Sequence, residues 1–488
     1  MSYDRTVIAS TRPVAAAAQT GVVLERLPQL DQRRPIDVAE QFRAAPGLVL
    51  LESARPGRHG RWSYLGADPV ALLESPGGPG ATAGRDDPLA DARRLLGRLD
   101  PGHLDGRDVP PFLGGLVGYV GYDLGRRLER IPERARADQP MPDLRLALHD
   151  WVIAWDRRSG RAYLAGRAVD GETGRLAARL AEVRRILASR PADPPGAESV
   201  APPALTFTSG LDRSAFEAGV EAIRDAIARG EIYQANLTRR LETSFDGDPW
   251  PLFRRLRTGD PSLMAAFLDL GSDGTGAGPR ALLSASPEPF LTLSADRQVS
   301  SDPIKGTRPR GRTREEDQAL ARELLASAKD QAENVMIVDV LRNDLGRVCV
   351  PGSVRVPRLC RLERTAAVQH LVTTVTGRLR ADRDGFDLLA ASFPGGSITG
   401  APKIRAMELI EALEPVRRGP YAGAAGWIGP DGAMATSILI RTFVADGRRL
   451  TIHVGGGITW RSDPAAEWDE TVAKVRGPLG AIGGREIA

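Results

Sequence analysis

The sequence predicts an α+β protein in which strands and helices come in separate runs. Strand-like and helix-like segments do not alternate along the chain, which argues against a doubly wound sheet of βαβ units. The chain has 488 residues with 42% hydrophobic content, so it can bury one large core or two to three smaller ones. Five prolines between residues 190 and 203 indicate a linker, because such segments are extended.

These observations divide the chain into four expected parts. They are a loose tail at 1–20, an N-terminal region at 21–189, a Pro-rich linker at 190–207, and a region at 208–482 that carries the candidate catalytic motifs.

In the N-terminal region, short apolar and aromatic runs bounded by turn residues are predicted as strands. The segment 112–123 is rich in glycine, apolar and aromatic residues, so we expect tight packing of backbone on backbone there rather than a phosphate loop. The predicted strands are 48–53, 62–65, 69–73 and the hairpin pair 150–155 and 162–165, with a surface loop at 75–88 and a helix at 173–189.

Beyond the linker, the same criteria predict further strands and helices. The loop Gly271–Gly278 resembles a dinucleotide fingerprint, but it joins two strands instead of opening a helix, so we interpret it as a hairpin connection. The predicted strands are 232–238, 262–270, 281–293 and 453–458, and the helices are 213–229, 314–327, 329–345 and 404–414.

Bulk composition excludes several classes of protein. The 66 basic and 62 acidic residues are interspersed, so the net charge of +4 predicts no nucleic-acid partner. No apolar run approaches the roughly 18 residues of a membrane span, and the N-terminus lacks the pattern of a secretory signal. Two cysteines, Cys349 and Cys360, are too few for a disulfide framework or a zinc site, so we expect a reducing cytoplasm.

Lysine is rare in this chain, and arginine is common. Only Lys305, Lys329, Lys403 and Lys474 occur among the 66 basic residues. A retained lysine is a candidate for work that a guanidinium cannot do, because an ammonium is compact and can lose its proton to become a nucleophile. The alternative is that these four lysines have no special function. The residues around each lysine decide between a functional and a non-functional interpretation.

The C-terminal strand and helix form the first candidate site. Three glycines at 455–457 let a ligand approach bare backbone, and Asp463 followed by Pro464 is a typical helix start. Glu467, Glu470, Thr471 and Lys474 then share one helix face. That face could hold a magnesium ion and an anionic substrate, although taken alone an ordinary solvated face with an ion pair is favoured.

A second pair of acids opens the helix predicted at 329–345. Asp330 and Glu333 share one face, and magnesium usually takes one or two protein carboxylates together with water and substrate oxygens. One carboxylate from each of the two helices would satisfy that preference. Acids that complement the helix dipole are an equally weighted alternative.

Two further loops are candidates for substrate contacts. The Gly-rich loop at 394–403 runs into a helix, and such loops direct backbone N–H groups at an anion, either a carboxylate or a phosphate. In the other loop, Lys305 is followed by Arg308, Arg310 and Arg312, and we expect these cations to lower the lysine's pKa.

Together these segments resemble the chorismate-utilising enzymes, a family that includes anthranilate, aminodeoxychorismate, isochorismate and salicylate synthases. The similar segments are Tyr233–Leu237, Ser286–Leu291, Pro303–Thr307, Asp330–Gly346, Gly396–Lys403, Tyr421–Gly426, Ile440–Thr442 and Glu467–Thr471. The resemblance implies two packed antiparallel β-sheets with outer helices, Mg²⁺ as cofactor, chorismate as substrate, and a separate glutaminase subunit that supplies ammonia. Neither cysteine of this chain lies in a glutaminase nucleophile turn.

Within that family, two positions point to one reaction. Isochorismate and salicylate synthases have a lysine base where this chain has Gln234, and anthranilate synthases have alanine where it has Lys305. A lysine at 305 is similar to aminodeoxychorismate synthase component I, in which the lysine attacks the substrate ring, and whose product leads through a lyase to p-aminobenzoate for folate synthesis. Anthranilate synthase component I is the alternative, and a non-catalytic chorismate-binding protein is a more distant one.

The resemblance also implies a role for each site residue. The expected catalytic residues are Lys305 as nucleophile, Glu288 as general acid, Gln234, and His370 with a role left open. The expected metal ligands are Glu333 and Glu470, with Asp330 and Glu467 in the outer shell. The expected substrate contacts are Gly306, Thr307, Thr399, Tyr421, Arg441, Gly455, Gly456, Gly457 and Lys474.

A second binding site is implied in the N-terminal region. Ser53, Trp62 and Ser63 lie in segments similar to the family's tryptophan-binding segment. Its companion Asn-Pro-Ser-Pro-Tyr-Met is here Asp260–Ala265, with the sequence Asp-Pro-Ser-Leu-Met-Ala. That departure favours a structural pocket over feedback inhibition by tryptophan.

Overall fold

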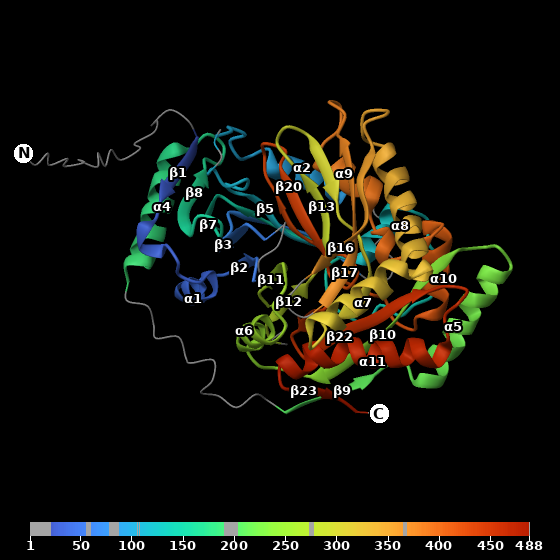
Figure 1. Cartoon of the computed structure of the whole chain (residues 1–488). Coiled ribbons are helices and arrows are strands. Elements are labelled where there is room, and N and C mark those ends of the chain that lie inside the picture. The colour runs from blue at the N-terminus through green and yellow to red at the C-terminus, as the bar shows by residue number, and fades with distance from the viewer. Residues whose placement is uncertain are drawn as a thin grey trace, which may run out of the picture.

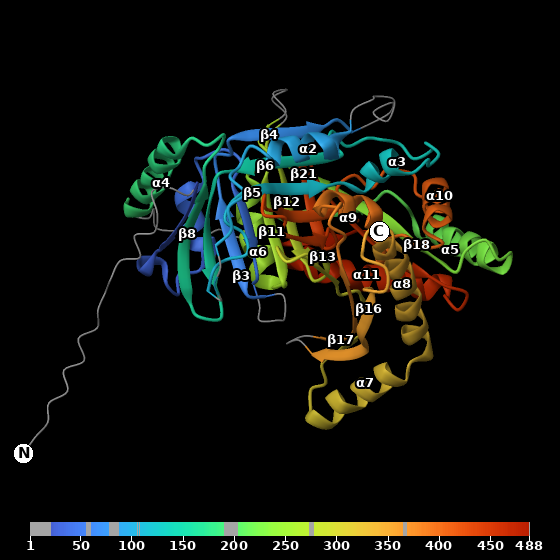
Figure 2. The same cartoon turned by 90° about the horizontal axis from the view of Figure 1, so that it is seen from above.

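Two large β-sheets packed face to face organise the chain in the computed structural model (Figures 1 and 2). The structure describes residues 21–54, 60–77, 87–104, 106, 108–189, 204–272, 278–364 and 368–487. The expected tail at 1–20 and most of the expected linker lie outside these residues. The two sheets with outer helices confirm the α+β prediction.

The first sheet takes strands from both sides of the linker. Its described strands pair antiparallel, except for β9 with β23. In sheet order they are β1 (Val22–Arg26), β8 (Arg161–Arg167), β7 (Trp151–Asp156), β3 (Trp62–Gly66), β2 (Val49–Glu52), β11 (Met264–Asp269), β12 (Arg280–Ser286), β21 (Thr442–Asp446), β22 (Arg449–Ile458), β10 (Gln234–Ser244), β9 (Leu205–Ser209) and β23 (Gly484–Glu486), with β18 (Gly400–Ala401) beside β10.

The second sheet is likewise built from both regions. In order, its described strands are β15 (Ile304–Pro309), β17 (Val368–Arg378), β14 (Gln298–Ser301), β13 (Pro289–Leu293), β20 (Met434–Ile438), β19 (Ala424–Ile428), β5 (Gly115–Val120), β6 (Leu144–His149) and β4 (Ala71–Ser75), with β16 (Arg355–Arg364) beside β17.

A hydrophobic core fills the space between the sheets. Tyr64 of β3, Val117 of β5 and Val444 of β21 are buried in it. Trp427 of β19 stacks on Phe112 with ring centroids 4.8 Å apart. Both sheets bury apolar surface in this layer. The layer therefore holds together the parts of the chain before and after the linker.

Helices cover the outer faces of both sheets. Helices α4, α6 and α11 pack on the first sheet, and α2, α8 and α9 pack on the second. The helices are α1 (Pro35–Ala39), α2 (Pro88–Leu96), α3 (Gly125–Leu128), α4 (Thr173–Ala188), α5 (Arg213–Ala228), α6 (Pro249–Gly259), α7 (Arg314–Ala326), α8 (Ala328–Gly346), α9 (Gly385–Ser392), α10 (Lys403–Leu413) and α11 (Pro464–Ala481), with 3-10 turns at Pro28–Leu30, Glu40–Phe42, Tyr122–Leu124 and Gly396–Ile398.

The glycine-rich segment packs tightly, as predicted. It forms β5, and a Cβ added at Gly118 would lie 2.0 Å from the carbonyl oxygen of Arg145 on β6. The hairpins β7–β8 and β11–β12 and the start of α11 at Asp463 are also confirmed.

Two element predictions are wrong. The segment 281–293 is two strands, because Pro287 and Glu288 interrupt it and the chain crosses from β12 in the first sheet to β13 in the second. The last residues of the expected linker belong to β9, which begins at Leu205. The first correction matters for function, since it places Glu288 at the crossing between the sheets.

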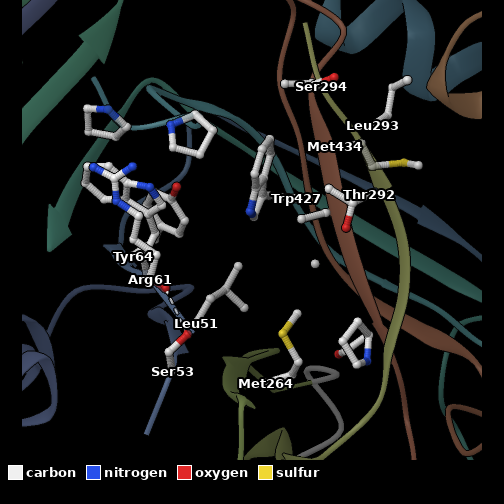
Figure 3. Close-up of a pocket in the computed structure, with 18 of the residues that line it drawn as sticks. Leu51, Ser53, Arg61, Tyr64, Met264, Thr292, Leu293, Ser294, Trp427 and Met434 are labelled. Atoms are coloured by element: carbon white, nitrogen blue, oxygen red, sulfur yellow. Dashed lines mark hydrogen bonds between the residues drawn. The ribbon is translucent and has the colours of Figure 1, made fainter. Parts of the chain in front are cut away.

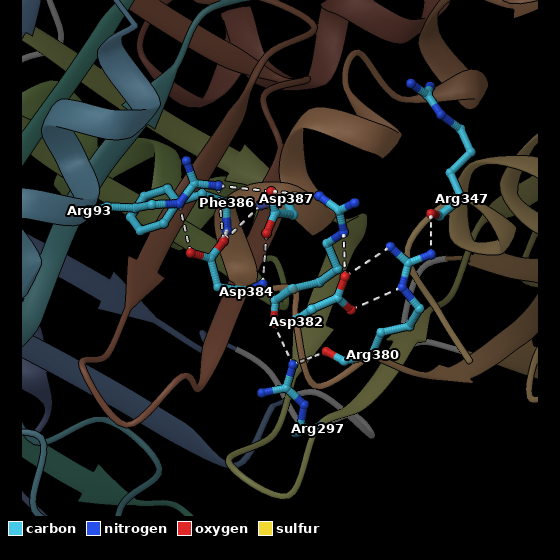
Figure 4. A network of polar contacts seen from close by, with 9 residues as sticks. Arg93, Arg297, Arg347, Arg380, Asp382, Asp384, Phe386 and Asp387 are labelled. Atoms are coloured by element: carbon cyan, nitrogen blue, oxygen red, sulfur yellow. Dashed lines mark hydrogen bonds and ion pairs between the residues drawn. The ribbon is translucent and has the colours of Figure 1, made fainter.

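A polar network ties α2 to the start of α9 (Figure 4). The side chain of Asp384 accepts hydrogen bonds from the N–H groups of Phe386 and Asp387, both at 2.9 Å, and so caps α9. It also accepts one from Nε of Arg93 at 2.7 Å. A carboxylate that both caps a helix and pairs with a neighbouring element contributes more than a surface ion pair.

We therefore expect Asp384→Ala to lower the free energy of unfolding by about 1–2 kcal/mol. The control is Asp382→Ala in the same network, whose carboxylate is more exposed and pairs with Arg380 and Arg383. That change should cost less than about 0.5 kcal/mol. Midpoints of thermal unfolding measure both, and equal losses would contradict the capping role of Asp384.

Candidate active site

A cavity of about 540 Å³ brings together most of the residues singled out in the sequence. Its walls come from β15, α8, β22 and α11 and from the crossing at Glu288. Strands and helices that are far apart in sequence thus place cations, acids and bare glycine backbone around one space. Such a set of convergent polar groups in a cavity is typical of a site for a small anionic molecule.

Lys305 extends from β15 into this cavity. Its Nζ donates a hydrogen bond to the carbonyl oxygen of Ser397 at 3.3 Å. Burial lowers the pKa of Lys305, and the nearby carboxylates of Glu333 and Glu288 only partly offset this. A lysine in such surroundings yields a free amine more readily than a surface lysine does.

The reason for this low pKa differs from the one expected from sequence. Burial is its largest cause, and the cation that adds to it is Lys474. Arg308 donates to Glu323 at 2.7 Å, and Arg310 donates to Asp317 at 2.6 Å. The prediction that adjacent cations lower the lysine's pKa is therefore wrong in its cause, although its direction is right.

Glu288 lies in the wall of the same cavity. Its residue is only 7% exposed, and burial raises the pKa of its carboxyl group despite the nearby ammonium of Lys305. The backbone holds it in place, since its carbonyl accepts from the N–H of Ile438 on β20 at 3.0 Å. A buried carboxyl group with a raised pKa is suited to donate a proton.

The four predicted metal-site acids line the cavity from two helices. Asp330 and Glu333 extend from α8, and Glu467 and Glu470 extend from α11. Burial raises the pKa values of Glu333 and Glu467. Burial also acts on Glu470, but the adjacent Lys474 outweighs it, so the pKa of Glu470 lies below its usual value.

Two of these acids have close cation partners, and Glu467 accepts a hydrogen bond from the hydroxyl of Ser462 at 2.6 Å. Nζ of Lys474 lies 2.6 Å from Glu470, and Arg308 donates to Asp330 at 3.3 Å. Within the described ranges, no three His, Cys, Asp or Glu side chains are gathered closely enough to hold a metal. The donor set nevertheless fits Mg²⁺, because it offers hard oxygen ligands and Oε1 of Glu333 is buried without a hydrogen-bond partner in the described structure.

The three glycines of β22 open the cavity toward α11. A Cβ added at Gly456 would lie 3.2 Å from Glu467, and one at Gly457 would overlap the amide of Gln234 at 1.9 Å. Nζ of Lys474 donates to the carbonyl oxygen of Gly455 at 3.0 Å. Gly456 thus leaves space beside the acids that a side chain would fill.

Other predicted contacts form pairs in the cavity wall. The hydroxyl of Thr307 lies 2.9 Å from Nδ1 of His370. Tyr421 stacks on His453 with ring centroids 4.7 Å apart. Arg441 lies 3.5 Å from Asp260, and its backbone has the left-handed φ of 50°. An aromatic face, an imidazole and a guanidinium are therefore available to a bound molecule.

Three predicted residues do not reach the cavity lining. Gln234 is fully buried behind Gly457, and neither atom of its amide has a partner among the described residues. Thr399 is fully buried and donates to the carbonyl oxygen of Gly395 at 2.8 Å. Lys403 lies outside this cavity, where its ammonium donates to the carboxylate of the buried Asp344 at 2.8 Å.

The cavity also contains residues that sequence reasoning missed. Asn236, Ser397 and His453 line it. Asn236 precedes Leu237 on β10, and its N–H donates to the carbonyl oxygen of Thr399 at 2.8 Å. Alternation along β10 from Gln234 could have indicated that Asn236 shares its face. Ser397 and His453 lie in segments that the sequence singles out, but nothing in those segments marks these two side chains.

A second cavity of about 440 Å³ lies between the N-terminal strands β2 and β3 and the strands β11, β13, β19 and β20 (Figure 3). Ser53 and Trp62 line it, whereas Ser63 is buried beside it and accepts a hydrogen bond from the N–H of Ser53. Met264, from the segment Asp260–Ala265 that differs from the family's sequence, and Trp427 complete an apolar wall. The segments expected at a tryptophan site therefore do meet around one space.

Comparisons with known proteins agree with this arrangement. The family model described as chorismate binding enzyme matches residues 49–480. Aminodeoxychorismate synthase component 1 of Klebsiella aerogenes is 38% identical over 459 residues, covering 90% of this chain and 95% of that protein. Anthranilate synthase component 1 of Streptomyces coelicolor is 40% identical over 456 residues, covering 91% and 84%.

Among solved structures, anthranilate synthase component I of Streptococcus pneumoniae superposes with a TM-score of 0.74. It is 30% identical in sequence, and the match covers 87% of this chain and 93% of that one. In the described part of the chain, no helix is both long and apolar enough to cross a membrane.

Proposed function

The chain belongs to the chorismate-binding enzyme family, and from this premise we propose that it is the chorismate-converting component of an aminodeoxychorismate synthase. Relatives with that activity and relatives with anthranilate synthase activity are equally similar in sequence. The choice between them rests on one observation, the half-buried Lys305 beside Glu288 in the cavity.

Binding of the substrate is assigned to the cations and bare backbone of the cavity. The carboxylates of chorismate would be held by Arg441, Tyr421, Lys474 and the backbone at 455–457. Gly306 and Thr307 would contact the same end of the substrate. Mg²⁺ held by Glu333 and Glu470, with Asp330 and Glu467 behind them, would supply positive charge for the ring carboxylate.

The first chemical step uses Lys305 and Glu288. The free amine of Lys305 forms a bond to ring carbon C2 while the C4 hydroxyl leaves as water with a proton from Glu288, and the ring double bonds shift. The low pKa of the lysine and the raised pKa of the carboxyl group favour the protonation states that this step needs.

In the second step, ammonia bonds to C4 and Lys305 leaves C2 as a free amine. The double bonds return to their positions, and the proton that the new amine loses goes back to Glu288. The product is 4-amino-4-deoxychorismate, so one ammonia replaces one water and both side chains are regenerated. Gln234 lies where other family members have a lysine base for water, and a neutral amide cannot take that role.

The ammonia would come from a separate amidotransferase subunit. Cys349 is buried, and burial raises the pKa of its thiol to about 11, which keeps it unreactive at neutral pH. Cys360 also has a pKa raised by burial. Neither thiol is suited to attack glutamine, so we propose a heteromer with a glutaminase.

The test incubates the chain with chorismate, Mg²⁺ and ammonium, with and without an added aminodeoxychorismate lyase. We expect p-aminobenzoate only when the lyase is present. Anthranilate formed without the lyase would instead establish the alternative, anthranilate synthase component I. Binding of chorismate without any product would support the more distant alternative, a non-catalytic chorismate-binding protein.

For the cavity in Figure 3 we propose a structural role, because Leu263, Met264 and Ala265 replace the family's usual lining. We expect saturating L-tryptophan to leave the initial rate of the reaction unchanged. Calorimetric titration with L-tryptophan provides the binding measurement. Inhibition at micromolar concentration would contradict this proposal and assign the cavity to feedback control.

A further inference from the structure

Lys329 connects the two helices that carry the candidate metal ligands. It lies in the first turn of α8 and lines the active-site cavity. Its Nζ is 4.0 Å from Oε1 of Glu333 on the same helix and 3.9 Å from Oε1 of Glu467 on α11. One ammonium therefore contacts acids of both helices.

The contacts of Lys329 are looser than those of Lys474, another lysine at this site. Lys474 approaches Glu470 to 2.6 Å and also donates to the carbonyl oxygen of Gly455. Lys329 lies at the outer limit of an ion pair with both of its acids, and its side chain is 43% exposed. A long, half-exposed side chain held at this distance can move into solvent at little cost.

The choice of residue supports a cation that moves away. Only four of the 66 basic residues are lysines, and one of them stands here. An arginine at this position would offer a rigid fork that binds carboxylates through two hydrogen bonds, and such a pair is difficult to displace. A compact ammonium on a flexible stem neutralises the acids without locking them.

We propose that Lys329 is a resident counter-ion, which a divalent cation displaces when it binds between α8 and α11. This inference rests on the proposed metal role of Glu333 and Glu470. Lys329 thereby lowers the affinity of the site for Mg²⁺, and it holds the acids of the two helices together when no metal is bound.

The test is calorimetric titration of the full chain with Mg²⁺ alone, at constant ionic strength. We expect Lys329→Ala and Lys329→Gln to lower the Kd for Mg²⁺ roughly three- to ten-fold, because the competing charge is lost near partly solvated acids. Lys329→Arg should bind Mg²⁺ no more tightly than the native chain. Arg342→Ala is the matched control, since it removes a cation from the exposed face of α8, where Arg342 pairs with Asp339.

Thermal unfolding provides the second measurement. Lys329→Ala should have a lower Tm than the native chain without Mg²⁺, and a larger rise in Tm when Mg²⁺ is added. A Kd that is unchanged or higher in both neutral variants would overturn the proposal, even if their Tm fell. No binding of Mg²⁺ by the native chain would overturn the metal role itself, whereas absence of any ammonia-dependent product would count separately against the proposed reaction.

Discussion

Lys305→Ala is expected to reduce the formation of 4-amino-4-deoxychorismate from chorismate and ammonium roughly 10³-fold or more in kcat. The change removes the only amine that the proposed mechanism places at the substrate ring. Lys474 cannot replace it, because its Nζ is held by Glu470 at 2.6 Å and by the carbonyl of Gly455 at 3.0 Å. Product is measured as p-aminobenzoate after conversion by an added lyase.

Lys305→Arg separates charge from nucleophilicity. A guanidinium keeps the positive charge beside Glu288 and Glu333, but it is not a nucleophile at neutral pH. We therefore expect the arginine variant to be as inactive as the alanine variant while its Tm stays close to that of the native chain. Undiminished product from either variant would remove the covalent role of Lys305 and leave the fold and the cavity as described.

The parts of the site that the sequence predicted well share one physical property, which is local periodicity. Glu467, Glu470 and Lys474 are spaced along one helix face, so their meeting in the cavity follows from helix geometry. The start of α11 follows in the same way from Asp463 and Pro464, whose chemistry acts within one turn.

The parts that sequence reasoning missed depend on contacts between distant segments. Ser397 reaches the cavity because β18 pairs with β10, and His453 does so because β22 lies on the other side of β10. The resemblance placed Gln234 and Thr399 in the site, but both side chains are fully buried, and the amide of Gln234 lies against Gly457. Sequence motifs indicate proximity, whereas the direction of a side chain depends on packing.

The crossing at Pro287 and Glu288 illustrates the same limit. The apolar run at 281–293 reads as one strand, because its composition does not reveal that its two halves pair in different sheets. Proline interrupts the ladder at this point and lets the chain change layers. The same interruption brings Glu288 into the cavity. The wrong prediction of one strand at 281–293 and the position of the proposed general acid therefore have the same cause.

Glu288→Gln is expected to lower kcat about 10²- to 10⁴-fold with a smaller change in KM. The amide has nearly the same shape and preserves packing, but it cannot donate the proton that the leaving hydroxyl needs. Glu288→Asp should recover part of the activity, because it keeps the acid while shortening its reach. Full activity in the glutamine variant would exclude Glu288 as the general acid.

The dependence of kcat on pH offers an independent test of the same assignment. Glu288 must be protonated, so the rate falls as pH rises through its pKa, which burial places above the usual value for glutamic acid. Lys305 must be a free amine, so the rate also falls as pH decreases through its pKa, which burial lowers. The two shifts bring the limbs of a bell-shaped profile closer together. Glu288→Gln should abolish the fall at high pH and retain the fall at low pH, since only the carboxyl group has been removed.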